Sequence, residues 1–158
     1  MRQINGILDY EKPDIQNMGA VITADFTNAT AGLVNITGLS IPLLDHSTYA
    51  FEAIISAGVS ADGNGCPFAV DFSGVGANIE AQIFGALTTA SAIAERIAAL
   101  ATPTTALLTT ASQAGAVLIR GIINTVANGG NLTIQCAHPT TGTSTIRIGS
   151  YLRSVKIE

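Results

Sequence analysis

The 158 residues of this chain suffice for one domain, which would bury about two thirds of the surface that the unfolded chain exposes. Only 11% of the residues are charged, against about 25% in an average soluble domain, so we expect another subunit to cover part of the surface. The net charge is −4, and the seven Lys and Arg form no basic patch with interleaved aromatic rings, which excludes nucleic-acid binding as the main activity.

The N-terminal residues, MRQINGILDY, contain no apolar stretch of signal-peptide length. No later segment offers the run of about eighteen apolar residues that a membrane span requires. We therefore expect a protein that is made in a cytoplasm, stays soluble and has no membrane partner.

Residues 1–19 are predicted to form an extended N-terminal arm. Pro13 and Gly19 interrupt the segment, and no sustained period runs through it. It carries more apolar side chains than a solvated tail would need. These side chains are the predicted partner-binding residues of the arm: Ile4, Ile7, Leu8, Tyr10 and Ile15. A β-domain over residues 20–158 could fold without this arm, which we expect to serve attachment.

From residue 20 onward the chain has the pattern of an all-β domain. Candidate strands follow one another at intervals of about 8–15 residues, with Asn, Asp, Gly and Pro between them. This pattern predicts an antiparallel β-sandwich or jelly roll. The strands are expected over residues 20–26, 32–43, 48–58, 67–74, 77–86, 116–126, 131–139, 144–150 and 151–158.

Alternation within the strands predicts which side chains enter the core. In NLTIQCAHP, Leu132, Ile134 and Cys136 share one face, which is the period of a sheet buried on one side. By the same reasoning we expect Leu132, Ile134 and Ile148 in the sheet core. In TYAFEAIIS, every second residue from Tyr49 onward is apolar, and the other face is only partly polar, which indicates a central strand.

The segment over residues 88–115 is ambiguous. Its Ala and Thr side chains are small, and Ile93, Ile97 and Leu100 lie at helical spacing, so a short helix over residues 91–100 that stops before Pro103 is one reading. The same isoleucines also fit a strand. We favour the strand, because the flanking chain is β on both sides and tertiary pairing overrides weak helix propensity.

No motif in the sequence supports a metal, a cofactor or a catalytic residue. The stretch around Asp62 resembles half of a calcium loop but lacks the distant bidentate Glu, so we interpret it as a turn. Asp45, His46 and Ser47 are adjacent on one loop and cannot form a triad. His46 and His138 have no third ligand in view and are interpreted as polar loop residues.

The two cysteines, Cys66 and Cys136, have no CxxC spacing and no His clustered beside them. We interpret them as buried small apolar side chains. A disulfide and zinc ligation remain the alternatives.

Three charged residues within apolar strands are candidate subunit contacts, namely Glu52, Arg120 and Arg147. Charge is depleted at interface cores, but arginine is an exception because its guanidinium makes several hydrogen bonds at once. The alternative is that all three face solvent.

The stretch IRGIINTVANGGNLTIQCAHPTTGTSTIRIGSYLRSVKI resembles a module of tailed-bacteriophage virion proteins, and ITGLSIPLLDHSTYAFEAII resembles its earlier part. Decoration (cement) proteins of the capsid, head fibres and tail-associated proteins contain this module. The resemblance covers about residues 20–158 and implies a jelly roll similar to tumour-necrosis-factor-like trimers. This chain departs from the pattern in its Ala- and Thr-rich segment over residues 86–114.

The resemblance implies two functions. The first is a structural virion protein, assembled as a homotrimer, that binds the major capsid protein and reinforces the outer surface of the capsid. The second is a receptor- or glycan-binding module of a phage fibre that uses the loops over residues 58–66 and 138–144. Glycan sites need exposed aromatic rings, and this chain has no Trp and few other rings, which favours the decoration protein.

Overall fold

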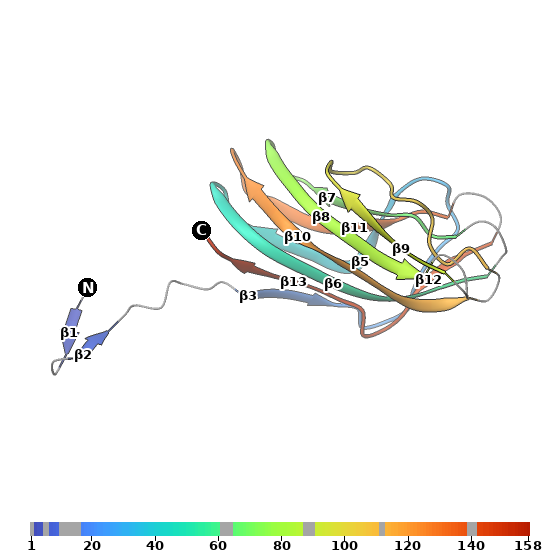
Figure 1. Ribbon diagram of the computed structural model, residues 1–158, viewed down its shortest axis with the longest axis horizontal. Coiled ribbons are helices and arrows are strands. Elements are labelled where there is room, and N and C mark those ends of the chain that lie inside the picture. The colour runs from blue at the N-terminus through green and yellow to red at the C-terminus, as the bar shows by residue number, and fades with distance from the viewer. Residues whose placement is uncertain are drawn as a thin grey trace.

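A computed structural model describes residues 18–60, 65–86, 91–110, 113–138 and 142–158, and the backbone of residues 2–4, 7–9 and 17. These residues form strands and connecting turns, with no helix among them, which confirms the all-β prediction (Figure 1). The strands are β1 (Arg2–Ile4), β2 (Ile7–Asp9), β3 (Asn17–Val21), β4 (Phe26–Asn28), β5 (Val34–Leu43), β6 (Ser47–Val59), β7 (Phe68–Phe72), β8 (Ala77–Ala86), β9 (Ala92–Ile97), β10 (Ala114–Thr125), β11 (Gly130–Cys136), β12 (Ser144–Ile146) and β13 (Tyr151–Lys156).

The strands from β3 onward form an antiparallel sandwich of two sheets, consistent with a jelly roll (Figure 1). The larger sheet has eight strands, with β3-β13-β6-β10-β8-β9 as its main path and β12 pairing with both β6 and β4. The smaller sheet has the order β5-β11-β7. Strands β1 and β2 pair with each other, in an antiparallel register.

Strand β6 is the central strand that its alternation predicts. It pairs with β10 over its whole length except the last residue and with β13 over six residues. Tyr49, Ala53 and Ile55 are fully buried, while Glu52 is half-buried on the opposite face. One face of the larger sheet therefore forms the core, and the other is the outer surface of the sandwich.

The core lies between the two sheets, where β11 supplies Leu132, Ile134 and Cys136, all fully buried as expected. A bulge between Thr133 and Gln135 shifts the pairing of β11 with β5, while the pairing of β11 with β7 stays regular. The expected inward face is preserved because the regular β7 side maintains the alternation.

The prediction that Ile148 lies in the core is wrong, because its side chain is 63% exposed. Strand β12 ends at Ile146 rather than continuing to residue 150. A turn follows, with Gly149 at a φ of 87° and the Ile148 amide donating to Asp25 Oδ1 at 2.8 Å. Because the turn at Gly149 ends the strand four residues early, the alternation does not reach Ile148, and this side chain points away from the core.

The strand expected over residues 20–26 is two strands, β3 and β4. The chain bends between them, where the Ile22 amide donates to the Ser150 carbonyl at 2.8 Å. Strand β3 begins at Asn17, inside the segment expected to be the arm, and Asn17–Gly19 pair with Val155–Arg153 of β13. Backbone pairing along β13 does not require polar and apolar side chains to alternate. The sequence pattern therefore did not reveal that the strand begins before residue 20.

The ambiguous segment forms strand β9, which confirms the favoured reading. It pairs with the edge of β8 in a register from Ala81↔Ile97 to Ala86↔Ala92. Ile97 is buried and Ile93 packs against the core. Burial of these isoleucines and main-chain pairing with β8 outweigh the helix propensity of the alanines.

Candidate interaction surface

The outer face of the larger sheet carries a row of polar side chains that crosses five strands. The registers of β13, β6, β10, β8 and β9 align Arg153, Glu52, Arg120, Gln82 and Arg96 in that order. All except Glu52 are exposed. We call this set the polar row. It places three arginines and one glutamate at the same height, which means at the same position along the strand direction of the sheet.

Within the polar row, Glu52 is already hydrogen-bonded on one side. Its Oε1 accepts from the Arg153 guanidinium at 2.8 Å and from the Tyr151 hydroxyl at 3.1 Å. Burial of the Tyr151 hydroxyl and its bond to the Glu52 carboxylate raise the pKa of Tyr151 above its usual value. A carboxylate has about four acceptor positions, so Glu52 can accept further hydrogen bonds.

At the other end of the row, Arg96 pairs with a carboxylate of the adjacent row. Its Nε donates to Glu80 Oε2 at 2.9 Å, and its Nη2 donates to the second carboxylate oxygen. The bidentate pair lowers the pKa of Glu80 below its usual value and raises that of Arg96. Both side chains are largely exposed, so the pair contributes little to stability.

Arg120, in the middle of the row, has a different environment. Its guanidinium lies over the ring of Phe84, 5.2 Å from the ring centroid. Within the described part of the chain, no carboxylate is at ion-pair distance from it. Arg120 therefore presents hydrogen-bond donors outward from the middle of the polar row.

Apolar side chains flank the polar row on both sides. The first flanking row, the Ile54 row, consists of Val21, Tyr151, Ile54, Leu118, Phe84 and Ala94. The second, the Ile122 row, consists of the apolar Val155, Ala50 and Ile122 and ends at the charged Glu80. Ile54 is 38% exposed and Ile122 is 48% exposed.

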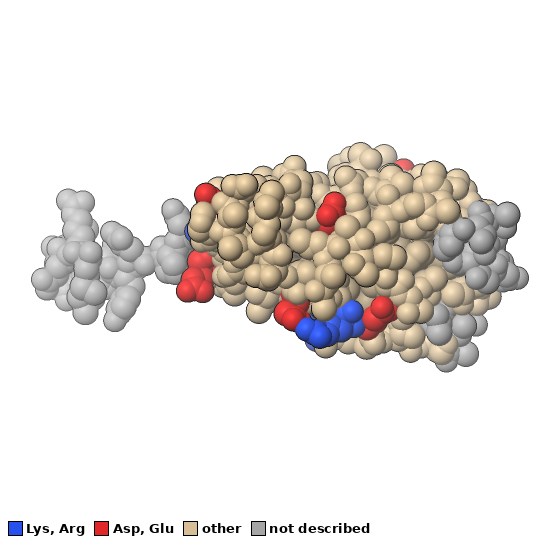
Figure 2. Space-filling view, turned by 90° about the horizontal axis from the view of Figure 1, so that it is seen from above, with Lys and Arg blue, Asp and Glu red and all other residues tan. Residues whose placement is uncertain are grey.

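Each flanking row borders a shallow hollow in the surface. A hollow of about 530 Å³ lies where Ala50 and Ile122 meet Arg120 and Arg96. A second hollow, of about 640 Å³, is lined by residues that include Ile54, Leu118 and Phe84. In the view of Figure 2, charged side chains are sparse on the sandwich, and most of the visible Lys and Arg surface lies in one place with Asp and Glu on both sides of it.

The structure brings two of the three predicted subunit contacts together. Glu52 and Arg120 are direct partners on β6 and β10. Arg147 lies apart, just beyond β12, at a pocket of about 360 Å³ that Asp25 and Gln113 also line. The sequence pattern did not predict that Gln82, Arg96 and Arg153 belong to the same row, because their alignment depends on the registers between strands.

The predicted arm residues are described only in part. Ile4 lies on β1, and Ile7 and Leu8 lie on β2, where the backbone alone is described. Tyr10 and Ile15 lie outside the described residues.

The loops over residues 58–66 and 138–144 meet at one end of the sandwich. The Ser60 amide donates to the Thr143 carbonyl at 3.0 Å, and the Thr143 amide donates to Ser60 Oγ at 2.8 Å. Residues 61–64, including Asp62, and residues 139–141 lie outside the described part of the chain. The described residues thus join the two loops into one surface.

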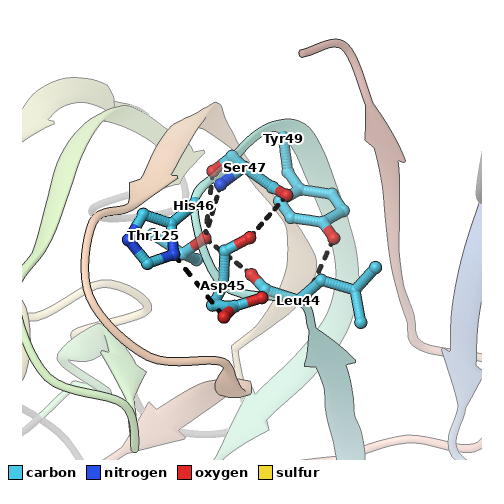
Figure 3. Close-up of polar contacts among 6 residues, drawn as sticks. All are labelled: Leu44, Asp45, His46, Ser47, Tyr49 and Thr125. Carbon is cyan, nitrogen blue, oxygen red and sulfur yellow. Dashed lines mark hydrogen bonds and ion pairs between the residues drawn. The ribbon is translucent and has the colours of Figure 1, made fainter.

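Asp45, His46 and Ser47 form a turn, as predicted, and not a catalytic triad (Figure 3). Ser47 Oγ donates to the Asp45 carbonyl at 2.7 Å, and the Ser47 amide donates to Thr125 Oγ1 at 3.1 Å. His46 adopts a positive φ of 45° and its Nδ1 lies 3.5 Å from Asp45 Oδ2. The hydroxyl of Ser47 is thus engaged with the turn backbone.

Cys66 and Cys136 are both buried and free, as expected. The contact with the Cys136 thiol and burial raise the pKa of the Cys66 thiol well above its usual value. His138 is fully buried beside them, with Nδ1 2.8 Å from Ser144 Oγ. As interpreted, His138 lies in the connection after β11, but it is fully buried there, and its amide donates to the Thr30 carbonyl at 2.8 Å.

Among the described residues, no group of three His, Cys, Asp or Glu side chains is placed to hold a metal ion. The same residues include no helix that is long and apolar enough to cross a membrane.

No protein-family model matches the sequence, and no curated protein matches it. Among solved structures, the chain is similar to a structure of the Gx strain of infectious bursal disease virus, with 13% identity and a TM-score of 0.25 over 92% of this chain and 39% of that chain. It is also similar to the VP2 subviral particle of the same virus, with 13% identity and a TM-score of 0.26 over 92% of this chain and 40% of that chain.

The chain therefore spans about two fifths of the length of these viral chains. The TM-scores are too low to establish a common fold, so nothing about function is transferred from them.

Proposed function

We propose that this protein is a non-enzymatic structural component of a bacteriophage virion, which binds the outer surface of the capsid and reinforces it as a decoration protein. The observation that carries the proposal is the outer face of the larger sheet. Ile54 and Ile122 are exposed there on either side of the polar row. Such a face is unfavourable in water and is typical of a protein that functions in an assembly.

Two further observations support this assignment. The described chain from β3 onward is an antiparallel sandwich consistent with a jelly roll, as the resemblance to the virion module implies. The charged content of 11% is low for a protein that is solvated on all sides. A fold of this kind hosts many functions, so the assignment depends on the surface and the sequence motifs together.

The proposed partner is the major capsid protein, and the proposed attachment segment is the chain before β3. Because Asn17–Gly19 pair with β13, this segment comprises residues 1–16. Its side chains Ile4, Ile7, Leu8 and Ile15 would be buried against the capsid shell. Burial of these side chains would offset the entropy that the two partners lose on association.

A binding experiment tests the proposal. Phage particles are stripped of this protein, and the purified protein is added back at increasing concentration. We expect saturable cosedimentation with the particles, a higher temperature for genome release, and cryo-EM density for a β-sandwich on the outside of the head. Density on the tail, or no recovery of bound protein, would contradict the decoration function.

A receptor- or glycan-binding module of a phage fibre is the second candidate. The bonds between Ser60 and Thr143 favour it, because they join two loops into one surface at the end of the sandwich. Binding of the purified protein to host cells, and not to stripped heads, would support this alternative.

A further inference from the structure

The larger sheet has a symmetry in its strand order that bears on self-association. Its main path, β3-β13-β6-β10-β8-β9, has three strands on each side of the line between β6 and β10. A second copy could be placed face to face on this sheet by a twofold axis along that line. Strand β6 of one copy would then lie over β10 of the other, β13 over β8, and β3 over β9.

This arrangement matches the charges of the polar row. Glu52 and Arg120 are at the same height on β6 and β10, so the rotation places Glu52 of each copy opposite Arg120 of the other. It also places Arg153 opposite Gln82, which is uncharged. Arg96 comes to lie opposite Gly19, the partner of Arg153 on β3. No two arginines meet.

Shifting the axis by half a strand spacing would destroy this match. An axis along β6 places Glu52 on Glu52 of the second copy and Arg153 on Arg120. An axis along β10 places Arg120 on Arg120 of the second copy and Arg153 on Arg96. Like charges in contact across an interface are strongly unfavourable. The charges therefore select the axis between β6 and β10.

Most pairs of the flanking rows are apolar under the same rotation. The exception is Val155, which lies opposite the Glu80 carboxylate that Arg96 already binds. Ile54 lies opposite Leu118 of the second copy, and Ala50 lies opposite Ile122. Tyr151 lies opposite Phe84, so that an aromatic ring meets an aromatic ring. Sheets packed face to face cross at about −30°, so these contacts are closest near the axis, where the apolar side chains lie.

We propose that the outer face of the larger sheet binds the same face of a second copy of this chain, in a twofold dimer that pairs Glu52 of each copy with Arg120 of the other. The dimer supplies the carboxylate that Arg120 lacks within the described chain. It covers Ile54 and Ile122 in the same step. Twofold contacts are self-complementary, whereas a threefold axis joins two different surfaces, so the face favours a dimer over the expected homotrimer.

Sedimentation equilibrium of the purified protein at micromolar concentration, without capsids, tests the proposal. We expect twice the chain mass of 16.1 kDa. Arg120→Glu and Glu52→Arg should each raise the dimer dissociation constant at least about tenfold, because each places like charges opposite one another. Arg147→Glu is the matched control, because Arg147 lies outside the polar row, and it should leave the dimer intact.

Mixing the two variants provides a sharper test. In a heterodimer of Arg120→Glu with Glu52→Arg, both positions pair opposite charges again. We therefore expect the equimolar mixture to dimerise although neither variant does so alone. Circular dichroism melts establish that each variant is folded. Arg120→Gln provides a milder variant with the same expected direction.

A wild-type monomer or trimer would overturn the twofold dimer, and so would a mixture that stays monomeric while both variants are folded. The outcome is distinguishable from that of the capsid experiment, although a dimer would by itself account for the exposure of the outer face in the single chain. Failure to dimerise leaves the decoration function standing, and failure to bind capsids leaves the dimer standing.

Discussion

The guanidinium of Arg120 lies 5.2 Å from the centroid of the Phe84 ring, with the two residues on the neighbouring strands β10 and β8. The electron-rich face of the ring attracts the cation. The ring thereby holds the charge of Arg120 over an apolar part of the sheet. The contact orients the donors of Arg120 before any partner binds, which lowers the entropy cost of binding.

Replacing the ring tests this relationship. Phe84→Leu keeps an apolar side chain but removes the cation–π contact, so we expect a loss of about 0.5–1 kcal/mol in the free energy of unfolding. Urea titration measures the change. Phe84→Tyr keeps the ring and should retain the wild-type stability more closely. Equal losses for Leu and Tyr would show that the ring does not stabilise Arg120.

Two isoleucines that the sequence pattern treats alike should respond differently to truncation. Ile134 is fully buried between the sheets, so Ile134→Ala should lower the free energy of unfolding by about 2–5 kcal/mol. Ile148 is 63% exposed, so Ile148→Ala should change it by less than about 0.5 kcal/mol. Chemical denaturation of both variants measures the contrast, and similar losses would contradict the placement of Ile148.

Two deletions at the N-terminus should distinguish the residues needed for attachment from those needed for folding. Deletion of residues 1–16 should preserve the thermal melt and abolish capsid binding, because these residues precede the first strand of the sandwich. Deletion of residues 1–19 also removes the residues of β3 that pair with Val155–Arg153, so it should lower the melting temperature. The two deletions are compared by calorimetry and by rebinding to stripped particles.

A full-length variant controls for the loss of chain. Ile4→Ser, Ile7→Ser, Leu8→Ser and Ile15→Ser in combination keep the length but remove the apolar side chains. We expect this variant to bind capsids as weakly as the shorter deletion. Retention of capsid binding by both would show that another surface attaches the protein.

The bidentate pair of Glu80 and Arg96 predicts a pH dependence. The folded-state pKa of Glu80 is lowered, chiefly by the hydrogen bond from Arg96. The pair therefore contributes stability above the unfolded-state pKa of glutamate, and this contribution is lost as the pH falls through the lowered folded-state pKa. The effect is small because both groups are exposed.

An NMR titration of the Glu80 carboxyl carbon measures this pKa directly. We expect a value below the usual range in the wild type and a return toward that range in Arg96→Gln. Arg153→Gln, at the other end of the polar row, is the matched control and should leave the pKa of Glu80 unchanged. A wild-type value in the usual range would contradict the ion pair.

Much of the fold was predictable from alternation within single strands. The inward faces of β6 and β11 follow from a period of two over Tyr49–Ile55 and Leu132–Cys136, because successive side chains of a strand point to opposite faces. Alternation left the segment of β9 ambiguous, and a strand was favoured there because the flanking chain is β on both sides. The prediction from alternation failed at Ile148, where a turn at Gly149 ends the alternation early.

Only the tertiary structure shows which residues form the polar row. Glu52 and Arg120 were each candidate contacts in the sequence, but the sequence contains no signal that they are partners or that Arg153, Gln82 and Arg96 share their height. Alternation determines which face of a strand a residue occupies. The register between strands depends on turns, bulges and core packing along the whole chain, and these are fixed only when the sandwich is assembled.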